Sequence, residues 1–245
     1  MLKLAVDRLP RLVSPCPIVE ATVEVRFISS RVPPEAIVGL VYGDLRRAFP
    51  SIQRLPITNL PKPMLGLDGN LRFQPHHRLE GDKRVLLLGP NVLAVSVLFP
   101  YPGWGSFSKL VLGVLEVVSR AALFDSPVRL GVRYINFFER NVLDQLRLKM
   151  SLDDEPVDLS GSVLRVVADQ APFRCALTIT DQATADIEGS EKSGTLLDID
   201  TSLEDVPSGF VANPREVLEA AHVAEKTTFF GILGPTLLSD LHPEF

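Results

Sequence analysis

Apolar and polar residues alternate from position 19 to position 27, which predicts a strand with one face packed against a core. Pro33–Pro34 end this segment. Apolar residues then recur every three to four positions up to Ala48, as expected for a helix. Residues 51–70 are rich in proline and glycine, so they predict a loop with one short edge strand near Ile57.

A hairpin and a long helix are expected in the rest of the first half. Residues 84–88 and 92–99 are apolar and are separated by a Gly-Pro-Asn turn, which predicts the hairpin. A helix with one long apolar face is expected from Ser106, its N-cap, to Leu123. The first half therefore has the order strand, helix, strands, long helix.

The second half repeats this order. Residues 130–136 (LGVRYIN) align with residues 23–29 (VEVRFIS) at an offset of 107 residues. The stretch 142–150 predicts a helix, and Asn213 and Pro214 are expected to cap and begin a closing helix. Strands are expected between these two helices at residues 162–168, 173–180 and 195–201.

These patterns predict an α+β fold of two repeated strand-helix-(three strands)-helix units, residues 15–125 and 126–245, in one pseudo-symmetric structure. Antiparallel sheets are expected to pack on the long helices and to leave their other face partly open. The topology resembles the duplicated curved-sheet fold of the TATA-box-binding protein and the helix-grip folds. Such a likeness of fold does not imply a function.

The chain as a whole resembles an uncharacterised, sporadically distributed family of prokaryotic proteins of about this length. The resemblance rests on the segments PIVEA at 17–21 and RLGVRYIN at 129–136, and on the closing helix with His222, Phe229 and Phe230. Family members often have Glu directly after this His, where the chain has Val. The family has no established activity, and its scattered distribution implies an accessory or defence gene.

Composition excludes several classes of protein. The chain has 245 residues, of which 46% are hydrophobic and 22% charged, as in a globular protein with a sizeable core. The longest apolar windows, 85–99 and 110–124, are shorter than the roughly 18–20 residues of a membrane span, so no membrane role is expected. A net charge of −5 leaves nucleic-acid binding open but disfavours it. Two cysteines, and a segment 1–13 without a signal-peptide core, favour the cytoplasm.

Three arginines form the predicted ligand-binding face. Arg26, Arg129 and Arg133 are expected to point away from the core on the first strand of each half. A guanidinium group suits bidentate recognition of phosphate or carboxylate. The alternative is that these arginines pair within the sheets with the acidic residues Glu20, Glu24 and Glu139.

Tyr134 and His222 complete the candidate ligand-binding set, in a groove between sheet and long helix that Arg26 and Arg133 would share. For His222 the alternative is a half-buried helix residue, because no Ser, Cys or Asp stands at a spacing typical of a catalytic triad.

Trp104, Phe229 and Phe230 are candidates for binding a protein partner. Trp104, the single tryptophan, lies in a turn before a helix, and tryptophan is enriched at binding hot spots. The two phenylalanines lie on a closing helix that is expected to be only partly covered. The alternative for Trp104 is that it closes the core.

No metal site, cofactor or catalytic residue is predicted. His76 and His77 are adjacent, but neighbouring residues of a strand point to opposite faces, so both are not expected to bind one ion. Asp198 and Asp200 share a strand face, yet no third carboxylate has a suitable spacing. The chain also lacks a phosphate-binding loop, a dinucleotide fingerprint, a paired Cys motif and a nucleophile elbow.

Three hypotheses about function follow. The first is a non-catalytic binding or interaction module of a prokaryotic accessory or defence locus, acting through a protein partner or as a homodimer. The second is a small-ligand binder or enzyme that uses a groove between sheet and long helix. The third is a nucleic-acid binder on the open face of the sheet.

Overall fold

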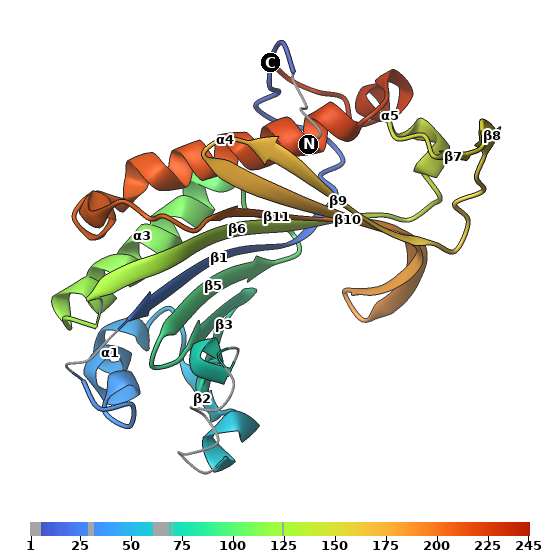
Figure 1. Cartoon of the computed structure of the whole chain (residues 1–245). Helices are drawn as coiled ribbons and strands as arrows, with labels where there is room; N and C mark the ends of the chain where they lie inside the picture. Colours follow the sequence, from blue (N-terminus) through green and yellow to red (C-terminus); the bar gives the residue numbers. More distant parts are fainter. Residues whose placement is uncertain (1–5, 29–31, 61–68, 70, 124) are drawn as a thin grey trace. The chain divides into compact units, whose positions relative to one another are not determined.

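The computed structural model describes residues 6–28, 32–60, 69, 71–123 and 125–245 (Figure 1). The first half contains β1 (Ile18–Ile28), α1 (Ile37–Leu45), β2 (Ser51–Arg54), the 3-10 helices η1 (Pro56–Asn59) and η2 (Leu71–Phe73), β3 (His77–Gly81), β4 (Arg84–Leu88), β5 (Val92–Leu98) and α3 (Trp104–Arg120). The second half contains β6 (Ser126–Phe138), η3 (Leu143–Gln145), β7 (Ser151–Leu152), β8 (Glu155–Pro156), β9 (Val163–Gln170), β10 (Phe173–Ile187), β11 (Ser190–Leu203), η4 (Ser208–Val211), α4 (Pro214–Ile232) and α5 (Pro235–Asp240).

The fold is α+β, with a large antiparallel sheet and a few helices. Nine strands pair in the order β2-β3-β4-β5-β1-β6-β11-β10-β9, and β7 pairs with β8 alone. The chain divides into two compact units. Unit 1 comprises residues 1–21, 132–202 and 220–245, and unit 2 comprises residues 22–131 and 203–219. Strands β1, β6 and β11 contribute residues to both units.

Unit 2 has its core between strands and helices. Residues Val23, Val25 and Phe27 of β1 are buried and alternate with more exposed positions, as the sequence pattern predicts. Helix α3 contacts β5, and α1 contacts α3. The buried residues of both helices recur at helical spacing and are Ile37, Val41 and Leu45 in α1 and Phe107, Ser108, Val111, Val114, Leu115 and Val118 in α3.

Unit 1 has a separate core beneath α4. In the β10–β11 pair, Leu177 lies opposite Ile199 and Ile179 lies opposite Leu197, and all four side chains are buried. Phe229, Phe230 and Leu233, from the end of α4 and the residue that follows it, belong to the same cluster. Apolar residues of the N-terminal segment pack against it and are Val6, Leu9 and Val13.

Most predicted elements of the second half are present, and three of them are longer than expected. The predicted strands correspond to β9, β10 and β11, and α4 begins at Pro214 as expected. β10 and β11 continue as a two-stranded ribbon past Thr180, where the pairing of β10 with β9 stops at Val163 (Figure 1). None of the helices in the described ranges combines the length and the apolar character needed to cross a bilayer.

The helix predicted at residues 142–150 is wrong. Only the 3-10 turn η3 forms there, followed by β7. The segment is held by backbone hydrogen bonds, because the Gly234 N–H donates to the Gln145 carbonyl (2.7 Å) and the Arg147 N–H donates to the Ile232 carbonyl (2.7 Å). The apolar residues of this segment have the spacing of a helix in the sequence, but they pack on the unit 1 core from an irregular backbone. They are Val142, Leu143, Leu146 and Leu148.

Two smaller predictions also need correction. The edge strand expected near Ile57 is the 3-10 turn η1, which begins at a proline that has no N–H to donate. Helix α3 begins at Trp104 instead of after Ser106, because Gly103, its N-cap, takes the positive φ of 83° that glycine tolerates. The predicted loop at 51–70 contains β2 and η1, and its positions 61–68 and 70 lie outside the described residues.

Candidate functional site

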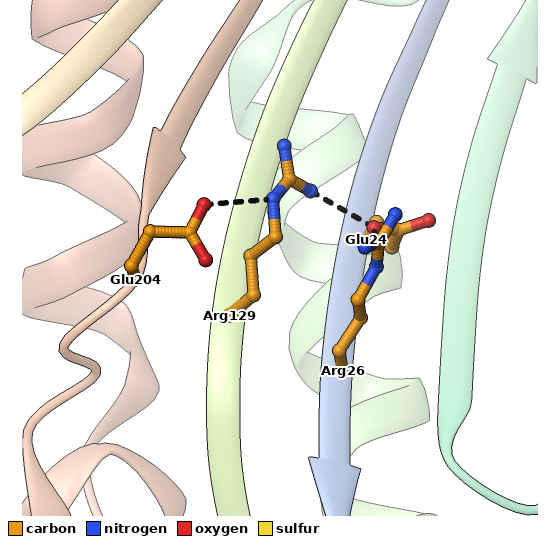
Figure 2. A network of polar contacts seen from close by, with 4 residues as sticks. All are labelled: Glu24, Arg26, Arg129 and Glu204. Carbon is orange, nitrogen blue, oxygen red and sulfur yellow. Dashed lines mark hydrogen bonds and ion pairs between the residues drawn. The ribbon is translucent and has the colours of Figure 1, made fainter. Parts of the chain in front are cut away.

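The arginine-bearing face of the sheet is occupied by ion pairs. Figure 2 shows Glu24 between two arginines of unit 2. Its Oε1 accepts hydrogen bonds from Arg26 Nε (2.8 Å) and from an Arg129 terminal nitrogen (2.9 Å). Arg129 Nε also lies 3.3 Å from Glu204 Oε1, so this arginine lies between two carboxylates. Arg26 and Arg129 are therefore paired with acidic residues, which is the alternative that the sequence analysis gave to a ligand-binding role.

Arg133 is paired in the same manner in unit 1. Its Nε and one terminal nitrogen donate to the two oxygens of Asp198, both at 2.7 Å, which is the bidentate geometry of a strong guanidinium–carboxylate pair. The hydrogen bonds to Asp198 raise the pKa of Arg133, and the charges of Asp198, Asp200 and Glu20 act in the same direction. Glu139, which the sequence suggested as a partner, lies instead 3.3 Å from Lys192 Nζ.

Arg129 is expected to contribute more to stability than Arg133, because its side chain is 14% exposed whereas that of Arg133 is 48% exposed. Replacing Arg129 with methionine should lower the free energy of unfolding by on the order of 1–2 kcal/mol. Arg133→Met, the matched control, should cost less than about 1 kcal/mol. Urea denaturation of both variants measures the difference, and equal losses would contradict the assignment.

Tyr134 and His222 are brought together on the helix side of the sheet in unit 1. The Tyr134 hydroxyl lies 3.2 Å from His222 Nδ1, and Tyr134 is fully buried. Burial lowers the pKa of His222 to about 3, with a smaller effect from Lys226. The imidazole is therefore neutral at physiological pH and forms part of the packing between β6 and α4.

The groove predicted from Arg26, Arg133, Tyr134 and His222 is not formed by these residues as a set. Arg133 and Tyr134 are neighbours on β6, so their side chains leave opposite faces of the sheet. The exposed Arg133 bonds Asp198, whereas the buried Tyr134 contacts His222. Of these four candidates, Tyr134 and His222 contact each other, whereas Arg133 and Arg26 each bond a carboxylate of the sheet.

The three candidates for partner binding are differently placed. Phe229 and Phe230 are buried in the unit 1 core with ring centroids 5.0 Å apart, which corrects the expectation that they lie on an uncovered face. Trp104 is half-buried at the start of α3, and its Nε1 donates to Glu219 Oε2 at 2.7 Å. Its ring meets that of Phe107 edge-on at 6.0 Å. Trp104 therefore joins the start of α3 to Glu219 within unit 2.

A cavity of about 570 Å³ in unit 2 brings together residues that sequence reasoning had not combined. This volume is typical of a small-molecule site. Apolar and turn residues form part of its wall, including Pro34, Leu60, Leu71 and Pro90. The charged or ionisable residues of its wall, within the described ranges, are Glu35, Arg54, Arg72, His76 and His77.

Strand pairing positions the basic residues of this cavity. Arg54, the last residue of β2, lies directly opposite His77, the first residue of β3, and such partners share a sheet face with Cβ atoms about 4.5–5.5 Å apart. The His76 N–H donates to the Leu88 carbonyl and the Leu55 N–H donates to the His76 carbonyl, both at 2.9 Å. The backbone that carries both histidines is therefore fixed on two sides.

Both histidines line the same cavity. The expectation that they face apart does not apply, because His76 lies just before β3 and outside the alternation of the strand. Burial lowers the pKa of His76, and His77 and Arg54 lower it further against the opposing charge of Glu35. Burial, followed by Arg54, lowers the pKa of His77. Among the residues that the structure describes, no three His, Cys, Asp or Glu side chains cluster to hold a metal ion.

Only some of the residues that line this cavity could be recognised from the sequence. The His76–His77 pair was visible, but Glu35, Arg54 and Arg72 come from three other segments whose meeting depends on tertiary structure. No protein-family model matches the chain, and no curated protein matches it at a significant level. The function is therefore inferred from the residues and their geometry.

Proposed function

We propose that the protein is a non-catalytic binding module and that the cavity of unit 2 holds a small ligand with an anionic group. The observation that carries the proposal is the convergence of Arg54, Arg72, His76 and His77 on one cavity of about 570 Å³. Arginine and histidine donate hydrogen bonds to phosphate and carboxylate oxygens. The arginines of the open sheet face are paired with carboxylates, whereas these four residues line a space.

The charge of the cavity wall supports an anionic ligand. Arg54 and Arg72 are permanently charged and Glu35 supplies one opposing carboxylate. Within the described ranges, neither arginine forms an ion pair with a carboxylate. Leu60 and Leu71 supply apolar surface for the rest of a ligand. This combination of apolar wall and few charged groups is typical of small-molecule sites.

Calorimetric titration of the full chain with phenyl phosphate and with benzoate tests this function. Each probe joins an anion to the same apolar ring, and at least one of them should bind. Replacing Arg54 and Arg72 together with alanine should weaken that binding by about 100-fold or more, because each charged hydrogen bond contributes about 1.5–3 kcal/mol.

Arg165→Ala is the matched control, because Arg165 is an exposed arginine on β9 of unit 1 and does not line the cavity. It should leave binding unchanged. Far-ultraviolet circular dichroism of all variants should match the parent chain, since Arg54 and Arg72 are exposed. Absence of binding by both probes, or equal binding by the double variant, would overturn the proposed function.

A duplicated architecture is also proposed, in which residues 15–125 and 126–245 are copies of one unit. Strand order supports it: β1 and β6 are neighbours, and the sheet continues outward as β5-β4-β3 from β1 and as β11-β10-β9 from β6. In each half a long helix, α3 or α4, also follows the strands. The likeness to the duplicated sheet of the TATA-box-binding protein or to helix-grip folds belongs to the same proposal.

The remaining sequence-based hypotheses stay proposals. They are a protein partner or homo-oligomer, nucleic-acid binding on the open face of the sheet, a cytoplasmic location and a role in a prokaryotic accessory or defence locus. A binding module with an anionic ligand is compatible with each of them.

A further inference from the structure

The wall of the unit 2 cavity contains residues with fixed charges and residues that titrate near neutral pH. Arg54 and Arg72 carry fixed positive charges, Glu35 carries a negative one, and His76 and His77 titrate. Because burial and the nearby Arg54 lower the pKa of both histidines, they are neutral at pH 7 in the free protein. The charge of the cavity wall is therefore less positive than its four basic residues suggest.

We propose that the ligand is a phosphomonoester dianion and that its binding draws a proton onto the His76–His77 pair. This inference rests on the proposed function and names its ligand class. A dianion beside an imidazole favours the protonated ring, since opposite charges within about 4–6 Å favour each other's charged form. The bound cavity then gains a positive charge that compensates the second negative charge of the ligand.

The geometry favours a phosphate over a carboxylate. Arg54 and His77 are cross-strand partners, and His76 is held beside them by hydrogen bonds on both sides of its backbone. Donors from β2, from η2 and from the start of β3 thus surround one space. A phosphate group has three terminal oxygens to accept them, whereas a carboxylate has two in one plane.

The sign of the pH dependence follows from proton linkage. The histidines have a higher pKa in the complex than in the free protein, so binding takes up protons and tightens as pH falls between those values. Glu35, Arg54 and Arg72 are the other ionisable groups of the described cavity wall. Between pH 6.5 and 8 the phosphomonoester stays largely dianionic, since its second pKa is about 6.

Calorimetry with phenyl phosphate tests the inference. Titrations at pH 7 in two buffers of different ionisation enthalpy should show a measurable net uptake of protons, of at most two per ligand bound; no uptake would contradict the inference. Affinity for phenyl phosphate should rise on going from pH 8 to pH 6.5, by up to about tenfold per pH unit for each proton taken up. At pH 7 phenyl phosphate should bind about tenfold more tightly than benzoate.

The double variant His76→Gln, His77→Gln separates the histidines from the arginines. It should still bind phenyl phosphate through Arg54 and Arg72, but without proton uptake. His242→Gln, an exposed histidine of unit 1, is the control and should behave like the parent chain. Benzoate binding as tight as phenyl phosphate, or uptake that persists in the double variant, would overturn the inference while leaving the proposed function standing. Failure of both probes to bind would instead overturn the function.

Discussion

Replacing Phe229 with alanine is expected to lower the free energy of unfolding by about 3–5 kcal/mol. The side chain is 5% exposed and belongs to the cluster that joins α4 to the buried faces of β10 and β11. Removal of the ring leaves a cavity among Phe230 and its neighbours, and this lost packing adds to the lost burial. Such a loss is a large fraction of the 5–15 kcal/mol that stabilises a typical domain.

Guanidinium chloride denaturation measures this effect, with Val223→Ala as the matched control. Val223 lies on the same helix but is 49% exposed, so its truncation should change stability by no more than about 0.5 kcal/mol. If Phe229→Ala is as stable as the control and instead loses a protein partner captured by the parent chain, the core assignment fails. The earlier prediction of a partner anchor would then be restored.

Elements with a regular hydrophobic period were predictable from the sequence. β1 alternates buried and more exposed residues, and α3 buries positions three to four apart, so local pattern and tertiary burial agree. The segment 142–150 has a similar density of apolar residues, but they pack on the unit 1 core from an irregular backbone. Sequence periodicity cannot distinguish these cases, because contacts with distant segments decide between them.

The site was less predictable than the fold, because it depends on which strands become neighbours. That Arg133 is exposed follows from alternation along β6, but its pairing with Asp198 requires β6 to lie beside β11. Likewise, Arg54 and His77 meet through the register of β2 with β3. The His76–His77 pair was the one local feature that pointed to the cavity. From the sequence alone, a metal ion was the ligand considered for this pair, whereas the neighbouring Arg54 and Arg72 favour an anion.

Glu225 was not singled out from the sequence, although the structure buries it within α4 of unit 1. The residue is only 4% exposed, and desolvation raises the pKa of its carboxyl to about 8, against a smaller lowering by the charge of Lys226. In the sequence of an amphipathic helix such as α4, a single glutamate is expected on the solvent-facing side. Its burial is a tertiary property, since it depends on the sheet against which α4 packs.

Replacing Glu225 with glutamine is expected to stabilise the protein by roughly 3–5 kcal/mol at about pH 8 and to change little at about pH 4.5. The folded-state pKa of about 8 lies above the ordinary value of 4.5, so the folded chain retains a proton that the unfolded chain releases. The stability that this group confers is complete below pH 4.5 and is lost as pH rises through 8; glutamine, which stays neutral, removes that loss. Denaturation of parent and variant across this pH range measures the difference, and Glu216→Gln, at an exposed position of the same helix, should show no comparable trend. Equal stability of Glu225→Gln and the parent chain at pH 8 would mean that the fold holds this carboxylate in its charged form.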